Sequence, residues 1–140
     1  MADIASTATL VSLVHPEQSV TYDFEAAEAI TVGQAVYQLA NGKVGVAGAD
    51  AAGKQQFRGL ALKSVPAGSG VTVLKEGLVW GFAVSGLNAD APVFLSNTLG
   101  ALGDTVGTMT VSAGRVLSIP EVGGPVKALY VCADWLRTWA

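Results

Sequence analysis

The feature of this sequence that most constrains its fold is a succession of short apolar runs separated by turns rich in glycine or proline. From Tyr22 onward the runs recur at intervals of roughly 8 to 12 residues, which is typical of all-β sandwiches and barrels. No segment has the periodicity of an ordinary amphipathic helix. The sequence therefore predicts an all-β fold, either a small β-barrel or a β-sandwich. The runs are "GQAVYQL", "KVGVA", "FRGLALKSV", "VTVLK", "LVWGFAV", "VFLS", "GRVLSI" and "VKALYVCADWL".

The turn residues between these runs predict how the strands connect. Asn41-Gly42 stands between the first two runs, and because both residues tolerate a positive φ, this pair is a strong hairpin signal. Glu76-Gly77 separates the fourth and fifth runs, which we expect to be successive strands. Gly81 and Gly86 predict bulges or bends that let the strands curl into a closed barrel.

Two aromatic residues in the fifth run predict part of the core. Trp80 and Phe82 alternate with Val79 and Gly81, so in a strand both rings lie on one face. Large aromatics in strands are more often core than surface, so we expect this face to be buried.

Residues 1–20 differ from the rest of the chain and predict an extended N-terminal arm. Residues 21–140 are expected to form the β-barrel or β-sandwich domain. The N-terminal segment has no helical periodicity and few large apolar residues, and Pro16 ends whatever precedes it. We expect the arm to be mobile in the free protein and to bind an exposed strand edge through its backbone. The alternative is that it forms the first strand of the barrel. The residues of the arm expected to contact this strand edge are the β-branched Ile4, Thr7, Thr9, Val11 and Val14.

The composition predicts association with other subunits. The chain has 140 residues, enough for one domain with a real core, and 51% are hydrophobic. Only 14% are charged, against about 25% in an average soluble domain, and the net charge is −3. A surface so poor in charge is expected to be partly covered by other copies or partners.

Several partner classes are not expected. The eight basic residues are scattered rather than clustered, so nucleic acid is not predicted as a partner. No uncharged stretch reaches the ~18 residues of a membrane-spanning helix, and "MADIAST" lacks the basic region of a signal peptide. We therefore expect neither a membrane partner nor export.

The motifs that resemble catalytic or nucleotide-binding sites are incomplete. Gly48–Gln55 matches the start of a phosphate-binding loop, but Gln55 stands where Ser or Thr would hold magnesium, and a strand rather than a helix follows. A nucleophilic Cys/His pair would need Cys132 and His15, the only residues of their types. Cys132 reads as a small buried hydrophobic residue and His15 precedes a proline. We expect no enzyme activity and no cofactor.

Metal and sugar sites remain alternatives. Asp23, Glu25 and Glu28 are close enough in sequence to hold a hard cation, but a solvated acidic segment is the commoner reading. The three tryptophans would suit a carbohydrate-binding module if they were exposed in a row. Trp135 and Trp139 instead suit anchors at a subunit interface, where Trp is enriched.

Residues 25–120 resemble the head decoration, or capsid cement, proteins of tailed bacteriophages. The resemblance rests on the "G-x-x-V-Y" strand with its glycine hairpin, on "RGLAL", "PAGSGVTV" and "EGLVWG", and on "NADAPVFLSNTLGALGD" and "GRVLSI". None of these is a catalytic motif, and glycine-rich β scaffolds recur in unrelated phage tail and fibre proteins.

The resemblance implies a structural virion protein. Such a protein forms homotrimers, binds the outer surface of the assembled shell of the major capsid protein, and stabilises that shell against internal pressure. It would be made in the host cytoplasm and located on the virion. A carbohydrate-binding or host-adhesion module and a phage tail or fibre component are the alternative functions.

Overall fold

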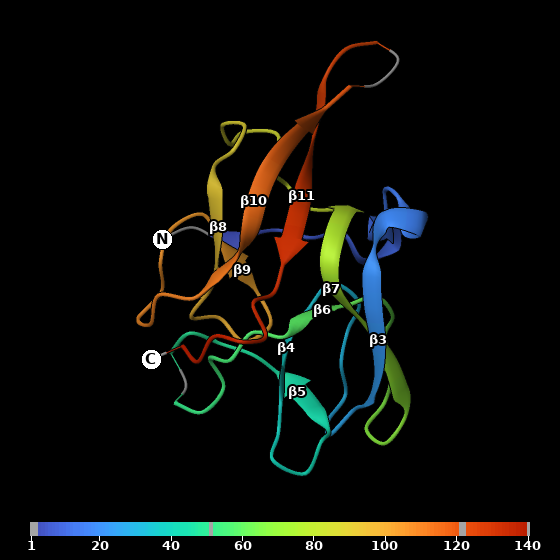
Figure 1. The fold of residues 1–140 in the computed structure, drawn as a ribbon, viewed down its shortest axis with the longest axis vertical. Helices are drawn as coiled ribbons and strands as arrows, with labels where there is room; N and C mark the ends of the chain where they lie inside the picture. Colours follow the sequence, from blue (N-terminus) through green and yellow to red (C-terminus); the bar gives the residue numbers. More distant parts are fainter. Residues whose placement is uncertain (1–2, 51, 121–122, 140) are drawn as a thin grey trace.

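The computed structural model describes residues 3–50, 52–120 and 123–139. Its regular structure is nearly all β, which confirms the all-β prediction (Figure 1). The elements in chain order are β1 (Asp3–Ile4), the 3-10 helix η1 (Ala8–Leu10), β2 (Ser12–Leu13), the 3-10 helix η2 (Pro16–Gln18), β3 (Val20–Glu25), β4 (Ala35–Gln38), β5 (Val44–Val46), β6 (Gly59–Ala61), β7 (Gly70–Trp80), β8 (Pro92–Leu95), β9 (Leu102–Gly103), β10 (Ser112–Ile119) and β11 (Val126–Cys132).

The strands form one antiparallel sheet that curls into a half-barrel around β7. The order along the sheet is β1-β9-β8-β10-β11-β7-β6-β4-β5. One edge of β7 pairs with β11 and β6, and the other edge pairs with β3 and β2. β10 and β11 make a long hairpin that pairs with β8 on one side and β7 on the other, and one end of it extends beyond the rest of the sheet (Figure 1).

The hairpin predicted at Asn41-Gly42 is confirmed. β4 pairs with β5, and Gly42 has a φ of 90° in the turn between them. The amide of Leu39 donates to the carbonyl of Lys43 at 2.7 Å, which closes the turn. The local pair of residues that tolerates positive φ is therefore sufficient to place this turn.

The break predicted at Glu76-Gly77 is wrong, because β7 runs through it as one bent strand. Val20 of β3 pairs with Glu76, and Thr21 pairs with Leu74, so β7 has one extra residue at this point. Such a bulge bends a strand without ending it. Gly77 follows with a φ of 153°, and a Cβ there would lie 2.7 Å from Ser19 Oγ.

The curl of the sheet separates two hydrophobic cores, and β7 contributes to both. Leu74 and Val79 belong to the larger core, whose largest fully buried side chain is Phe57. Val71 and Val73 belong to the smaller core. Because adjacent side chains of a strand point to opposite faces, Val73 and Leu74 separate into different cores.

The prediction that Trp80 and Phe82 share one buried face is wrong. Val79 is fully buried in the larger core, so Trp80, its neighbour, points to the other face and is only half-buried. The strand ends at Trp80, and Gly81 follows with a φ of 97°. Phe82 lies beyond this bend and packs partly against the larger core.

The N-terminal segment differs from the expected free arm, because the described residues before β3 pack on the domain. Ile4 of β1 pairs with Leu102 of β9 and is 7% exposed in the larger core. Leu13 of β2 pairs with Val79 of β7. The expected boundary between residues 20 and 21 falls inside β3. β1 and β2 pair with β9 and β7, which are distant in sequence. The composition of residues 1–20 alone does not indicate this pairing.

Candidate functional site

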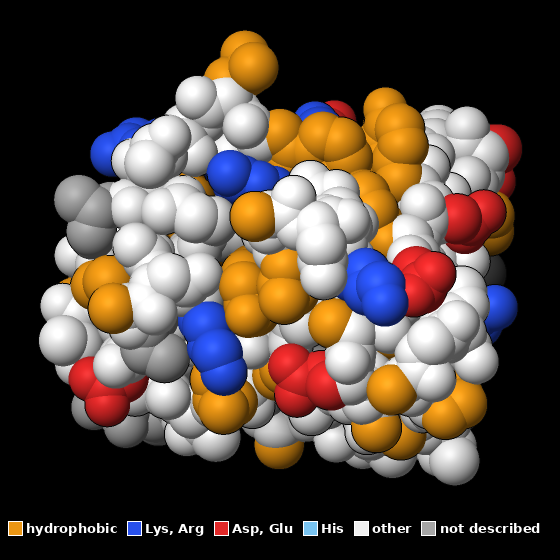
Figure 2. Space-filling model, turned by 90° about the horizontal axis from the view of Figure 1, so that it is seen from below, with side chains coloured by type: hydrophobic (Ala, Val, Ile, Leu, Met, Phe, Trp, Pro, Cys, Tyr) orange, Lys and Arg blue, Asp and Glu red, His pale blue; other side chains and the backbone are white. Residues whose placement is uncertain are grey.

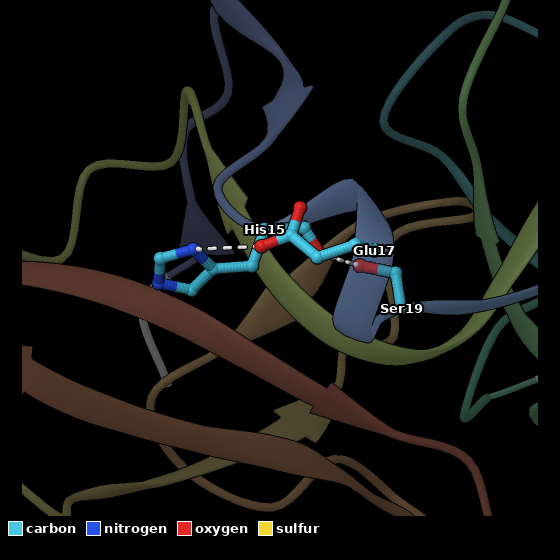
Figure 3. Close-up of polar contacts among 3 residues, drawn as sticks. All are labelled: His15, Glu17 and Ser19. Carbon is cyan, nitrogen blue, oxygen red and sulfur yellow. Dashed lines mark hydrogen bonds and ion pairs between the residues drawn. The ribbon is translucent and has the colours of Figure 1, made fainter.

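Three residues around η2 have the composition of a catalytic Ser/His/acid site but not its geometry (Figure 3). The hydroxyl of Ser19 donates to the backbone carbonyl of His15 at 2.8 Å, not to the imidazole ring. The ring nitrogen Nδ1 of His15 lies 3.7 Å from Oε1 of Glu17, and both side chains are largely exposed. A nucleophile needs a base within hydrogen-bond reach, so this cluster only closes the turn.

As far as the structure describes them, neither Cys132 nor the loop Gly48–Gln55 has the geometry of a catalytic or phosphate-binding site. Cys132 lies at the end of β11, where its thiol is 3.7 Å from Oε1 of Glu76. The imidazole of His15 lies beside Glu17 instead, so the two residues do not form a Cys/His pair. In the described part of Gly48–Gln55, the amide of Gly48 donates to the carbonyl of Lys54 at 3.1 Å, and chain without regular secondary structure leads from there to β6. A phosphate-binding loop presents its amides to the ligand at the start of a helix, which this loop does not do.

The three acidic residues considered for metal binding have separate partners. Asp23 accepts a hydrogen bond from the Thr72 hydroxyl at 2.9 Å, and Glu25 pairs with Lys43 at 2.8 Å. Glu28 accepts a bond from a backbone amide of β5 at 3.2 Å. Within the residues that the structure describes, no group of three or more His, Cys, Asp and Glu side chains is placed to hold a metal ion.

The face of the sheet that points away from the larger core carries a band of partly exposed apolar side chains, which we call the outer sheet face. Directly opposed residues of paired strands share a face, so Leu78 of β7 and Tyr130 of β11 lie side by side. None of the band packs against either core within the described residues. Its members are Leu78, Trp80, Phe94, Leu117, Ile119, Val126 and Tyr130.

A shallow pocket of about 240 Å³ lies on this face next to Tyr130 and Cys132. Burial is the main cause and the negative charge of the Glu76 carboxylate the second, and together with smaller effects they raise the pKa of Tyr130 to about 12. Burial likewise raises the pKa of the Cys132 thiol, with Glu76 as the second cause. The side chain of Cys132 reaches solvent, but its thiol is less acidic than a free one and is therefore a poor nucleophile.

The raised pKa predicts slow alkylation of Cys132. The thiolate is the reactive form, so iodoacetamide should modify Cys132 more slowly than free cysteine at pH 8, with the rate still rising at higher pH. Glu76→Gln removes the nearby negative charge and should shift the rate profile to lower pH. Glu25→Gln is the matched control, since it removes the same charge at the other end of β3, where Glu25 pairs with Gly70 rather than with Glu76. Equal profiles for the two variants would contradict the assigned role of Glu76.

The residues predicted to bind a capsid are not equally available. Ile4 is buried in the larger core. Thr7 and Thr9 are exposed, and Val11 and Val14 are half-buried. The amides of Thr7 and Val14 donate to carbonyls in or just after β7, at 2.8 and 3.0 Å. The backbone of this segment is thus already partly paired within the chain.

Trp139, predicted at a subunit interface, lies 6% exposed within its own chain. Its carbonyl accepts bonds from the side chains of Gln55 and Gln56 at 3.2 and 2.7 Å. Its amide donates to the Gln56 side chain at 2.8 Å. Trp139 therefore fixes the C-terminal tail to the domain and presents little surface to another subunit.

Trp135 lies half-exposed at the edge of a second depression of about 300 Å³, which we call the aromatic pocket. Its ring centroid is 4.8 Å from that of Tyr22 and 6.3 Å from that of Phe24. Its indole nitrogen donates to the carbonyl of Arg58 at 2.9 Å, which fixes the ring. The lining residues are Phe24, Gln38, Arg58 and Trp135.

Sequence reasoning singled out Trp135 but missed its neighbours in the pocket. Phe24, Gln38 and Arg58 come from segments far apart in the chain, and no local pattern connects them. The outer sheet face had a visible signal. In "GRVLSI" and "ALYVC" apolar residues occupy both alternating positions, which indicates strands with two apolar faces.

Comparison of the chain with known proteins leaves its family open. Within the described residues, no helix has the length and apolar character needed to cross a membrane. The chain matches no protein-family model, no curated protein and no solved structure.

Proposed function

We propose that this chain is a capsid decoration protein, a structural virion protein that binds the outer surface of an assembled phage capsid as a homotrimer. Its partner is the shell of the major capsid protein, and it stabilises that shell without catalysing a reaction. The proposal rests first on the outer sheet face, because the fold leaves the apolar side chains of this band partly exposed and outside both cores. The resemblance of residues 25–120 to phage decoration proteins supplies the class of partner.

The outer sheet face has the composition of a protein interface. It contains Trp80, Tyr130 and Phe94, and aromatic residues are enriched in interface cores. The salt bridge between Arg115 and Asp90, at 3.7 Å, lies beside it. Apolar residues inside a polar border are the usual arrangement of a docking surface. We assign this face to the contact between copies in the trimer.

The sparse charge of the rest of the surface fits attachment to a large shell. Figure 2 shows one side of the molecule, on which hydrophobic side chains gather in patches between scattered Lys, Arg, Asp and Glu side chains. Three copies held together bind a repeated lattice with avidity, so each contact with the shell can be weak. Closed threefold symmetry also stops association at a finite size.

Sedimentation of the purified protein tests whether it forms a trimer. Pelleting of the protein with assembled capsids tests whether it binds and stabilises them. At high micromolar concentration we expect a species of three times the chain mass. Capsids assembled from the major capsid protein encoded in the same genome should pellet with the protein and resist heat or dilution better for it. A protein that stays monomeric and does not pellet with capsids contradicts the proposal.

Trp80→Ala is expected to weaken the trimer more than the fold. The side chain is half-buried outside both cores, so the loss of stability should stay below about 2 kcal/mol. A central interface tryptophan contributes at least about 2 kcal/mol to binding, so the dissociation constant should rise roughly 30-fold. Sedimentation equilibrium measures the second effect and thermal melting the first.

Tyr22→Ala is the matched control for this variant. Tyr22 is an aromatic residue with 47% of its surface exposed, and it lies on β3 outside the outer sheet face. It should leave the trimer unchanged. If both variants weaken the trimer equally, or neither does, the outer sheet face is not the trimer contact.

A further inference from the structure

The aromatic pocket contains a guanidinium, that of Arg58, which forms no ion pair within 4.0 Å with any described residue. Burial, the larger effect, lowers the pKa of Arg58, while the Asp134 carboxylate, which lies farther away, raises it. Nη1 of Arg58 donates to the backbone carbonyls of Phe57 and Asp134, at 3.2 and 3.5 Å. Among the residues that the structure describes, no carboxylate lies within ion-pair distance of this guanidinium, and its Nε and Nη2 atoms have no hydrogen-bond partner. The guanidinium therefore retains free donors that line a depression of the surface.

A second positive charge and a free acceptor lie beside this group. Nζ of Lys75 is 5.4 Å from the ring centroid of Trp135. The amide nitrogen of Gln38 donates to the carbonyl of Gly42 at 3.1 Å, which fixes the side chain and leaves its oxygen free to accept a bond. In a chain of net charge −3, the positive charges of Arg58 and Lys75 against the single negative charge of Asp134 make the pocket locally cationic. It selects an anionic ligand over a neutral one.

The shape and chemistry of the pocket define the ligand further. A volume of about 300 Å³ is at the lower end for small-molecule sites, which suits one ring-sized group. A guanidinium with two free nitrogens matches a carboxylate bidentately. The aromatic side chains of Phe24 and Trp135 offer apolar surface to the C–H face of a ring. The oxygen of Gln38 matches a hydroxyl donor.

We propose that the aromatic pocket binds a uronic acid unit of an acidic polysaccharide. The carboxylate of the sugar pairs with Arg58, its C–H face lies against the aromatic side chains, and a ring hydroxyl donates to Gln38. The site is a second function of the chain and does not rest on the capsid proposal, since neither Arg58 nor Gln38 belongs to the outer sheet face. A protein that fails to form trimers can still bind the sugar, and the reverse also holds.

The test is an NMR titration of the full chain with tetragalacturonate. The three tryptophans give three indole N–H signals, and the signal of Trp135 should shift in a saturable way with a dissociation constant of about 1 mM or lower. Maltotetraose, a neutral tetrasaccharide, should bind at least about tenfold more weakly. N-acetylaspartate has a carboxylate but no sugar ring, and it should also bind more weakly. No saturable shift up to about 10 mM, or equal binding of either comparison compound, overturns the proposal.

Two pairs of matched variants test the role of Arg58. Arg58→Gln should weaken binding of tetragalacturonate about tenfold or more, while Arg137→Gln, which removes the same charge outside the pocket, should leave it unchanged. Arg58→Lys keeps the charge but loses the bidentate geometry, so its affinity should fall between the two. Melting curves show whether each variant folds. If Arg58→Gln does not fold, the comparison of Arg58→Lys with Arg137→Lys decides. Equal affinities within the pair that folds overturn the proposal.

Discussion

Gly114→Ala is expected to destabilise the domain more than any other small substitution. A Cβ at this position in β10 would lie 1.8 Å from the backbone oxygen of Tyr130 and 2.9 Å from its carbonyl carbon. These are main-chain atoms of β11 in the middle of the sheet, so they cannot move without breaking the ladder on both sides. We expect a loss of more than about 3 kcal/mol, at or above the usual upper range for overpacking.

Thermal melting and urea unfolding measure this effect, and Gly70→Ala is the matched control. Gly70 is also a glycine in a strand, but a Cβ there would meet no heavy atom within 4 Å. It should stay within about 1 kcal/mol of the parent protein. Gly114→Ala should melt more than about 10 °C lower. Similar melting of the two variants would mean that β10 and β11 do not approach each other as closely as the structure has them.

The position of Gly114 also explains how the outer sheet face is built. The register between β10 and β8 shifts between Ser112 and Gly114, which is the mark of a β-bulge. The bulge lets β10 follow the curl of the sheet, and beyond it the residues from Arg115 to Ile119 pair with β11 in unbroken register. Loss of this bulge would change which side chains reach the outer sheet face.

Local patterns were sufficient to predict most strands of this fold. "VFLS" and "GRVLSI" match β8 and β10, because a short apolar run between turn residues has few other stable conformations. The Asn41-Gly42 turn was predicted for the same local reason. These elements need no knowledge of which strand lies beside them.

The orientation of side chains could not be predicted where the strand is irregular. Large aromatics in strands are usually buried, which predicts Trp80 in the core, but Val79 takes the buried position. The extra residue of β7 beside β3 changes the alternation along the strand, so that Leu74 and Val79 both lie in the larger core. A bulge consists of two residues on one strand that oppose one residue on its partner, so it is recognised only once the strands are paired. The same reason explains why Glu76-Gly77 looked like a break.

The candidate sites depend on contacts between distant segments, so no local sequence pattern indicates them. The aromatic pocket brings together β3, β4, the segment before β6 and the C-terminal tail. Trp135 was noticed because tryptophan is rare and large. Arg58 was not, because its importance comes from its place in the pocket with no carboxylate of the described residues within 4.0 Å, which only the arrangement in space reveals.

Removal of residues 3–18 is expected to destabilise the domain by at least about 3 kcal/mol, within the range for losing a buried aliphatic side chain and leaving a cavity. The deletion removes Ile4 from the larger core. It also leaves the carbonyl of Gly81 and the amide of Ala83 without their partners, which are Thr7 and Ala5. Urea unfolding measures the change. If the deletion variant melts at the same temperature as the full chain, residues 3–18 do not stabilise the domain, and the prediction of a mobile arm holds.

A pair of point variants separates packing from docking in this segment. Ile4→Ala should lose about 2 kcal/mol or more, because the side chain is 7% exposed in the larger core. Thr9→Ala should change stability by less than about 0.5 kcal/mol, because Thr9 is exposed in η1 and belongs to neither core. If Thr9→Ala instead releases the protein from capsids at unchanged melting temperature, the exposed side of the segment contacts the shell while its buried side holds the domain together. If neither variant changes stability, the packing of β1 against β9 does not hold in solution.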